Sequence, residues 1–571
     1  MSMPLNKKYW KSIDQLNSFD KNLDKLQYNE FVSKLPEDFL GDEKMLNKST
    51  ASRRDFLKYA GFSTAAATIA ACEGPIINSV PYVFQPEQIR PGIANYYATT
   101  IADGYDFASI LIKTREGRPI KIESNTDSPV LGSANARVHA SVLSLYDSLR
   151  LKGPLFEGKD VKWDNFYNQT KAALNSLSSL DKKVVMMTPT LASPTTKKII
   201  DDFVKVFPNI IHVIYDSISY DSSLNAFEKY YGIRALADYD FSKADTIVGI
   251  GSDFLGDWQG GGYEKGYAET KRPVKRNNKA EMSWHMQFES NMSITGVNAD
   301  HRVPCTPSEQ KKILVYLHDR IRGLSSSVSL SAQLKKQVEK AVNRLLNSGT
   351  NAVVVSGIDD EAAQSAVLEI NSLLESKAFQ PEEPRLIRQG NSYEVNSTID
   401  SIINGNISGL ITLGVNPVFT TFKGAELNEA IKNLEFSLAF TSKTNETSSV
   451  SKFVAATPHF LESWGDFELK SGYFSLSQPT IRPLFNTQQF QDILLKLSGK
   501  TLKYYDSIKE YWNANILNGR SWSKTLHDGY VIAKNSNQIK RPDFGNIDLT
   551  SLRNSSEKKM SLILYSKIGM G

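Results

Sequence analysis

Short, almost continuous apolar runs alternate with amphipathic runs along much of the chain, and this alternation constrains the fold more than any other feature. Runs such as VVMMT at 184–188 and NAVVVSG at 351–357 have no polar face, so the strands they form must be buried on both sides. The runs between the strands have helical spacing, for example at 222–231 and 360–374. Buried strands separated by helices are typical of parallel sheets covered on both faces. The sequence therefore predicts an α/β protein with two doubly wound parallel-sheet units.

A small β region is predicted ahead of these two units. Residues 105–123 contain two strand-like runs, ASILIKT and RPIKIES, on either side of Arg115-Glu116-Gly117. A glycine turn between two alternating runs indicates a β-hairpin. Helical spacing follows at 140–149.

The chain is too long for one hydrophobic core, so several structural units are expected. Its closing run, SLILYSKIGMG, predicts a strand and a glycine turn, and we expect the domain that begins there to be cut short. We divide the chain into six segments: a polar leader at 1–51, an export signal at 52–72, an extended linker with a small β/α region at 73–180, a first α/β domain at 181–324, a second α/β domain at 325–484, and a connecting segment with the start of a truncated domain at 485–571.

The segment at 52–72 has the layout of an export signal. Arg53 and Arg54 precede a short apolar stretch that ends in small residues and Cys72. This stretch is too short to span a bilayer, which takes about 20 residues. SRRDFLK resembles a twin-arginine signal, and IAAC resembles a lipobox, in which Cys72 would be lipidated. The alternative is an amphipathic helix that starts with two arginines, and the long leader leaves open whether Cys72 is processed.

Cysteine and histidine usage excludes several classes of site. A [4Fe–4S] cluster usually needs four thiolates, and this chain has only Cys72 and Cys305. Its histidines are dispersed, without the HExxH or GxSxG spacing of common hydrolases. The basic run at 271–279 has neither interleaved aromatic residues nor a nucleic-acid-binding motif, so we expect no nucleic-acid partner. Cys305, with a proline on each side within two residues, is expected to be a small apolar residue rather than a nucleophile.

Five blocks resemble molybdopterin oxidoreductases, and they occur in the order found in that family. Each block is weak alone, but the ordered set is specific. The blocks are GRPIKIESNTDSP at 117–129, ASVLSLYDSLRLKGPL at 140–155, KADTIVGIGSDFLGDW at 243–258, LGVNPVFT at 413–420 and ATPHFLESWGDFELKSGYFSLSQPTIRPL at 456–484.

Within that family the chain is most similar to the large iron–sulfur subunit of alternative complex III, a Tat-variant-translocated molybdopterin oxidoreductase. The residues that carry this similarity are the displaced signal at 52–58, the segment at 80–99, HFLESWGD at 459–466 and the closing run. The resemblance implies a non-catalytic scaffold in a quinol-oxidising respiratory complex, on the periplasmic side of the inner membrane. It implies that this region binds no cofactor and that iron–sulfur clusters sit in a missing C-terminal ferredoxin-like domain. The implied partners are membrane quinol-oxidising subunits and haem c subunits, with the membrane surface reached through the complex or a lipid anchor.

Two other functions stay open. The chain could be an active molybdenum-dependent oxidoreductase of the bis-pterin type, with molybdopterin bound here and the iron–sulfur cluster on a partner subunit. It could also be a lipid-anchored protein that binds a solute between its domains.

A bound pterin dinucleotide would need glycine turns at strand ends, because backbone amides must come close to its phosphates. Gly251, Gly256, Gly414 and Asn416 follow predicted strands and are the candidate cofactor-binding residues, although tight turns without a ligand would explain them equally. The resemblance also places a molybdenum ligand near Ser219, where a helix cap is the more ordinary use of serine. We expect no metal site and no catalytic residue in this region.

Changing Arg53 and Arg54 together to lysine is expected to leave the protein on the cytoplasmic side, because the translocase reads the arginine pair. Cell fractionation followed by immunoblotting measures this. Unchanged export would show that the twin-arginine interpretation is wrong.

Overall fold

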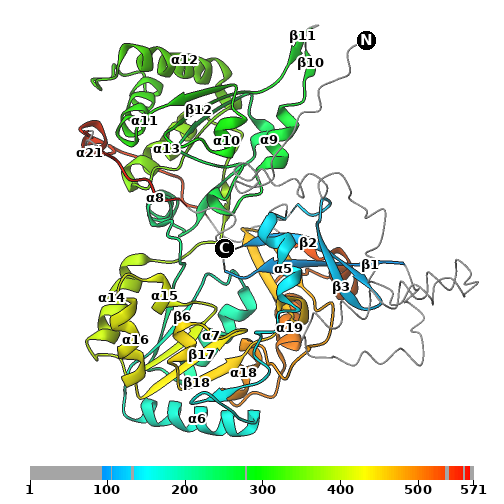
Figure 1. Ribbon diagram of the computed structural model, residues 1–571. Helices are drawn as coiled ribbons and strands as arrows, with labels where there is room; N and C mark the ends of the chain where they lie inside the picture. The colour runs from blue at the N-terminus through cyan, green and yellow to red at the C-terminus, as the bar shows by residue number, and fades with distance from the viewer. Residues whose placement is uncertain are drawn as a thin grey trace, which may run out of the picture. The chain divides into compact units, whose positions relative to one another are not determined.

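The computed structural model describes residues 93–104, 106–129, 134–276, 279–533, 539–556 and 560–565, without the side chains of 274–280 (Figure 1). The leader and the predicted signal, including Arg53, Arg54 and Cys72, lie outside the described residues, so they stay predictions. In the described part of the chain, no helix is both long enough and apolar enough to cross a bilayer.

The predicted β-hairpin near the start is confirmed. Strands β1 (Asn95–Ala102), β2 (Phe107–Arg115) and β3 (Arg118–Ser124) form an antiparallel sheet, and helix α5 (Ala136–Ser144) packs on β3. The turn between β2 and β3 consists of Glu116 and Gly117, both with positive φ, as a two-residue hairpin turn requires.

A seven-stranded sheet contains the first group of predicted strands. Its order is β5-β4-β18-β17-β16-β6-β7, and the five strands from β18 to β7 are parallel. Their bounds are Phe453–Ala456 for β18, Phe436–Thr441 for β17, Gly409–Leu413 for β16, Val184–Thr188 for β6 and Ile210–Ile214 for β7, with β4 at Leu155–Phe156 and β5 at Lys159–Asp160 on the edge.

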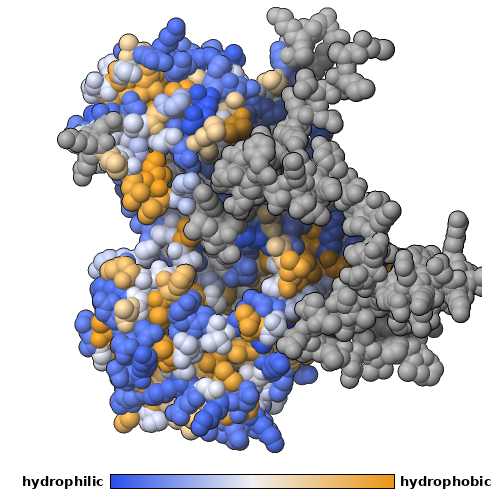
Figure 2. Space-filling view, in the orientation of Figure 1, coloured by the Kyte–Doolittle hydropathy of each residue, from blue (hydrophilic) through white to orange (hydrophobic). Residues whose placement is uncertain are grey.

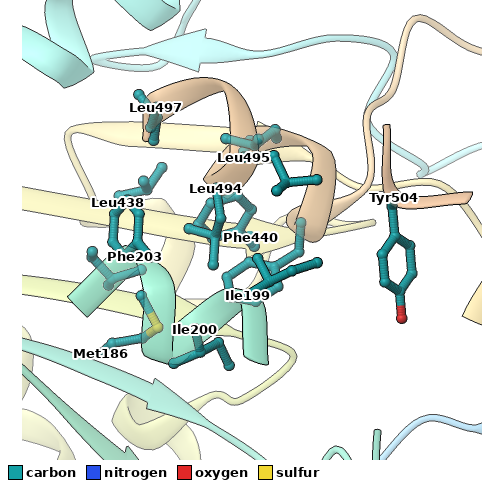
Figure 3. Packing of buried hydrophobic residues seen from close by; sticks show 14 of the residues in the cluster. Met186, Ile199, Ile200, Phe203, Leu438, Phe440, Leu494, Leu495, Leu497 and Tyr504 are labelled. Atoms are coloured by element: carbon teal, nitrogen blue, oxygen red, sulfur yellow. The ribbon is translucent and has the colours of Figure 1, made fainter. Parts of the chain in front are cut away.

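Helices cover both faces of this sheet. On one face Met186 of β6 belongs to a core cluster with α7 (Pro194–Val206) and α18 (Phe490–Leu497). Figure 3 shows Met186 beside Ile200 and Phe203 of α7. On the other face Val185 packs against α14 (Ser392–Ile403) and α16 (Gly424–Asn433). Alternate residues of one apolar strand are thus buried in two separate cores, which is why the strand has no polar face. Each fully buried side chain of this size contributes about 1.5–3 kcal/mol to stability.

A second, four-stranded sheet has the order β13-β12-β9-β14 and is parallel throughout. Its strands are β9 (Thr246–Ile250), β12 (Trp284–Glu289), β13 (His301–Pro304) and β14 (Ala352–Ser356). Val354 packs on one face and Val353 on the other, so this sheet is also covered on both sides. Two parallel, doubly wound sheets and a small N-terminal β region confirm the predicted fold class.

The sheets do not coincide with the segments at 181–324 and 325–484, because each sheet takes strands from both. Strands β16 to β18 join β6, and β14 joins β9. The segment at 485–571 also contributes to an earlier core, since α18 and α19 (Tyr504–Asn515) pack with the seven-stranded sheet.

A five-stranded antiparallel sheet, absent from our expectations, has the order β21-β20-β19-β15-β8. Its strands are β8 (Leu236–Tyr239), β15 (Phe379–Arg385), β19 (Gly465–Lys470), β20 (Tyr473–Ser477) and β21 (Tyr530–Ile532). The predicted strand in the closing run is wrong for its described part: residues 560–565 form no strand, since no neighbouring strand pairs with them.

The other elements connect these sheets or cover them. They are α6 (Trp163–Ser179), α8 (Asp221–Tyr231), η1 (Phe241–Lys243), η2 (Trp258–Gly260), α9 (Glu264–Thr270), β10 (Val274–Arg276), β11 (Lys279–Glu281), α10 (Ile294–Val297), α11 (Pro307–Ile321), α12 (Ala332–Ser348), η3 (Gly349–Asn351), α13 (Glu361–Leu373), α15 (Pro417–Thr420), α17 (Glu446–Ser449), η4 (Phe460–Glu462), α20 (Trp522–Asp528) and α21 (Thr550–Arg553).

The fully buried carboxylate of Asp466 connects three of these parts. It accepts hydrogen bonds from the hydroxyls of Ser193 (2.7 Å) and Thr195 (2.6 Å) at the start of α7. It also accepts from Tyr504 (3.2 Å) and from the indole N–H of Trp512 (3.0 Å), both on α19. A buried charge is tolerated only when it is well hydrogen-bonded, and this network supplies those bonds.

Asp466→Ala is expected to lower the free energy of unfolding by about 3 kcal/mol or more, because buried donors lose a charged acceptor. The apparent Tm, measured by scanning calorimetry, should fall by several degrees. Asp164→Ala is the matched control, since that side chain is 91% exposed. Equal Tm values for the two variants would contradict a structural role for the network.

Candidate cofactor site

The predicted cofactor turns lie at the carboxyl ends of interior strands. Gly251 follows β9 in the four-stranded sheet, and Gly414 follows β16 in the seven-stranded sheet. Both glycines have φ near +62°, a conformation that other residues adopt only at a cost. The structure thus confirms tight glycine turns at these two strand ends.

The amides of these glycines already have acceptors in the protein. Gly251 N–H donates to the carbonyl of Phe288 (2.8 Å), and Gly414 N–H donates to that of Phe440 (3.2 Å). Gly256 N–H donates to the carbonyl of Asp253 (2.9 Å). A phosphate bound at these turns would have to compete for donors that are in use, so the three glycines do not fit the role of phosphate-binding amides.

Asn416 is also engaged by the protein. Its Nδ2 donates to Glu446 Oε2 (2.6 Å), and its Oδ1 accepts from both the backbone N–H and the hydroxyl of Thr447. The hydrogen bond from Asn416 lowers the pKa of the Glu446 carboxyl. Asn416 therefore fixes the start of α17 to the end of β16, which accounts for an asparagine at this position without a ligand.

The space around the two strand ends differs. At Gly251 the backbone of Gly357 comes so close that a Cβ on Gly357 would lie 2.2 Å from the Gly251 carbonyl oxygen. The nearby hydroxyl of Ser252 is buried and has no hydrogen-bond partner among the described residues. At Gly414 the nearest atoms to an added Cβ belong to Pro189, 3.9 Å away. Gly414 is therefore less crowded than Gly251, but its amide is not free for a ligand.

Ser219 acts at the start of a helix. Its hydroxyl accepts a hydrogen bond from the N–H of Asp221 (3.1 Å), the first residue of α8, and its side chain is exposed. No group of three or more histidine, cysteine, aspartate or glutamate residues is arranged to hold a metal ion within the described ranges. The structure therefore gives Ser219 the ordinary use of a serine before a helix.

A partly buried ion-pair cluster joins the small β region to the loop after the four-stranded sheet's strand β9. Arg137 of α5 donates to Asp106, which precedes β2, at 2.9 Å and 2.8 Å. The same guanidinium donates to Asp257, beyond β9, at 2.7 Å and 3.0 Å. Burial opposes the charge, but the hydrogen bonds that Arg137 donates to the two carboxylates outweigh it, so the pKa of Arg137 is raised.

The space beside this cluster is almost filled. It encloses about 10 Å³, and Ile218, Tyr220 and Arg388 complete its wall. That volume is at the lower limit for a single water molecule. Sequence reasoning missed Arg137 and Asp106 because no short motif connects them; only the packing of α5 and β2 brings them together. Asp257 lies inside a recognised block, at 243–258, but nothing in the block indicates an arginine partner.

A second arginine holds the glycine-rich loop after β9. Arg385 pairs with Asp238 (2.6 Å) and donates to the carbonyls of Gln259 (3.0 Å) and Gly261 (2.6 Å). Its guanidinium lies 3.9 Å from the centre of the Tyr263 ring. These hydrogen bonds fix the backbone of the run at 259–263.

Cys305 is buried, and burial raises the pKa of its thiol to about 12. The thiolate is the nucleophilic form, so a thiol with this pKa is inert near neutral pH. The expectation of a small apolar residue is confirmed.

Known proteins resemble this chain in sequence and in fold. The menaquinone reductase molybdopterin-binding-like subunit of Nitratidesulfovibrio vulgaris (strain Hildenborough) is 22% identical, over 78% of this chain and 72% of that protein. The arsenate respiratory reductase molybdopterin-containing subunit ArrA of Shewanella sp. strain ANA-3 is 28% identical over 140 residues, which are 21% of this chain and 16% of that subunit. Acetylene hydratase from Pelobacter acetylenicus superposes with a TM-score of 0.57 at 9% identity, over 76% of this chain and 74% of that one. No family model matches the chain.

The chain has the fold of the molybdopterin enzymes, and the resemblance carried by the ordered blocks is confirmed. Among the proteins compared, the one it matches over most of its length by sequence is the molybdopterin-binding-like subunit of a menaquinone reductase.

Ser219→Ala is expected to lower stability by about 0.5–1 kcal/mol through loss of the bond to the helix start. It should leave the metal content of the purified protein unchanged. Elemental analysis by mass spectrometry and the apparent Tm measure the two effects, with Ser217→Ala as the matched control. A loss of bound molybdenum in Ser219→Ala alone would assign Ser219 as a ligand.

Proposed function

We propose that this chain is a non-catalytic, molybdopterin-oxidoreductase-like scaffold of a quinol-oxidising respiratory complex, alternative complex III. In this role the two α/β sheets and the small β region form a rigid body that holds cluster-bearing and membrane partners in register. Electron transfer needs fixed distances between cofactors, so a rigid body without its own redox centre has a physical use.

The observation that carries the proposal is the use of the predicted cofactor donors by the protein itself. The amides of Gly251, Gly256 and Gly414 donate to backbone carbonyls, and the side chain of Asn416 is bound to Glu446 and Thr447. The ion pairs of Arg137 fill the space between α5, β2 and the end of β9. Each feature supports a retained architecture whose cofactor positions serve internal contacts.

The similarity to a subunit named molybdopterin-binding-like within a menaquinone reductase supports a respiratory role beside other redox subunits. We place the protein on the periplasmic side of the inner membrane, exported through Arg53 and Arg54 and associated with the membrane through its complex or through Cys72. Membrane quinol-oxidising subunits and haem c subunits are the proposed partners. Iron–sulfur clusters would belong to a ferredoxin-like domain of the full-length protein.

The second candidate is an active molybdenum-dependent oxidoreductase whose iron–sulfur cluster lies on a partner subunit. Two observations favour it: the absence, among the described residues, of a contact closer than 3.9 Å to an added Cβ at Gly414, and the partial similarity to a molybdopterin-containing reductase subunit. In that case the bound pterin would supply the redox chemistry, and the side chains described here would only position it.

Purified native protein, isolated with its partners, is expected to contain far less than one molybdenum per chain and no extractable pterin, because the candidate donors are already hydrogen-bonded. Elemental mass spectrometry and the fluorescence of oxidised pterin measure these contents. The same preparation should contain haem and oxidise a quinol analogue.

Stoichiometric molybdenum would overturn the scaffold proposal and leave the second candidate. Absence of both molybdenum and redox partners would contradict both. ArrA prepared in parallel is the positive control for molybdopterin recovery, since it is named as a molybdopterin-containing subunit.

A further inference from the structure

One edge of the five-stranded sheet opens into a groove. Strand β21 is the terminal strand of that sheet and pairs only with β20 among the described residues. The groove lies between β21 and the segment at 516–524, and its volume is about 550 Å³. This volume falls within the range of functional binding pockets.

The backbone of Ile532, at this edge, is directed away from β20. Ala533 N–H donates to the carbonyl of Gly472, so residue 533 belongs to a hydrogen-bonded pair of the antiparallel ladder. Alternate residues of such a ladder direct their N–H and C=O groups to the opposite side. Ile532 therefore points its backbone groups away from β20, and its side chain is 53% exposed.

The groove combines an apolar floor with a positively charged rim. Leu517 and Val531 are buried and form the floor, while Arg520 and Lys524 are exposed at the rim. Neither cation forms an ion pair with any described residue. Exposed apolar side chains occur at several places on the surface (Figure 2), so exposure alone does not mark a docking site. This groove has two further features, a terminal strand of a sheet and two cations without an ion pair among the described residues.

We propose that this groove binds an extended, acidic segment of a partner protein, which adds to β21 as a further strand. The backbone of Ile532 would supply the ladder hydrogen bonds, and Arg520 and Lys524 would pair with carboxylates of the segment. Alternate apolar side chains of the segment would cover Leu517 and Val531. A second copy of this chain is disfavoured as the occupant, because two such edges would bring like charges together.

The test uses the full chain and short fluorescein-labelled peptides, with binding followed by fluorescence anisotropy. A peptide that alternates valine and glutamate is expected to bind, whereas one that alternates valine and lysine should not. Ile532→Pro removes one outward N–H without removing a bond to β20, and it should weaken binding about tenfold. The double variant Arg520→Glu/Lys524→Glu should weaken it at least as much. Ile211→Ala, at an exposed apolar residue on β7, is the matched control.

Equal binding of the valine–glutamate peptide to Ile532→Pro and to the unchanged chain would overturn strand addition. Failure of every peptide to bind would overturn the proposal as a whole. Phosphatidylglycerol vesicles test whether the groove binds a lipid surface instead of a protein segment. Vesicle binding that is lost in the charge-reversal variant and kept in Ile532→Pro would show that the ligand is a membrane and would overturn the protein partner. The apparent Tm of each variant must match that of the unchanged chain, and Ile532→Ala repeats the edge test without proline if Ile532→Pro is destabilised.

Discussion

The buried carboxylate of Asp466 is the interaction on which much of the architecture depends. Transfer of a charge out of water costs several kcal/mol, so it must be offset by donors held in place. Those donors come from the start of α7 and from α19, while Asp466 itself lies on β19. One buried charge therefore orders a helix of the seven-stranded sheet, a strand of the five-stranded sheet and a helix of the C-terminal segment. A shift of α7 or of α19 alone would remove two of the four side-chain donors of Asp466.

The Arg137 cluster likewise pairs charges that are partly removed from water, here between the small β region and the loop after β9. Two carboxylates close together repel each other, and a planar guanidinium between them satisfies both with paired hydrogen bonds. Because Asp106 precedes β2 and Asp257 follows β9, the cluster fixes the small β region against the loop beyond the four-stranded sheet. Arg385 repeats this arrangement with Asp238 and the carbonyls at 259 and 261. Two arginines from other elements, Arg137 on α5 and Arg385 on β15, thus bind the loop that follows β9.

The sequence predicted local features well and distant pairings poorly. Strands such as 184–188 and 351–357 were predictable because each apolar run has no polar face. The pairing of β14 with β9 was not, because parallel strands need long crossovers and their order leaves no trace in either run. The five-stranded sheet was missed because its strands come from positions that are spread from Leu236 to Ile532. The strand predicted in the closing run is wrong for its described part because the prediction used local strand propensity alone. A strand also needs a neighbouring strand to pair with.

A glycine at a strand end can be explained either by a tight turn or by a bound phosphate, and the candidate site distinguishes the two explanations. Gly251 and Gly414 were predictable as turns, and both have the positive φ that favours glycine. A phosphate-binding turn also needs a backbone amide that has no other acceptor. The sequence does not show whether an amide already has an acceptor. Here the acceptors are the carbonyls of Phe288 and Phe440, which belong to neighbouring strands of the same sheets. Because the positive φ of each turn is enough to explain a glycine at these strand ends, the motif indicates the fold without indicating a ligand.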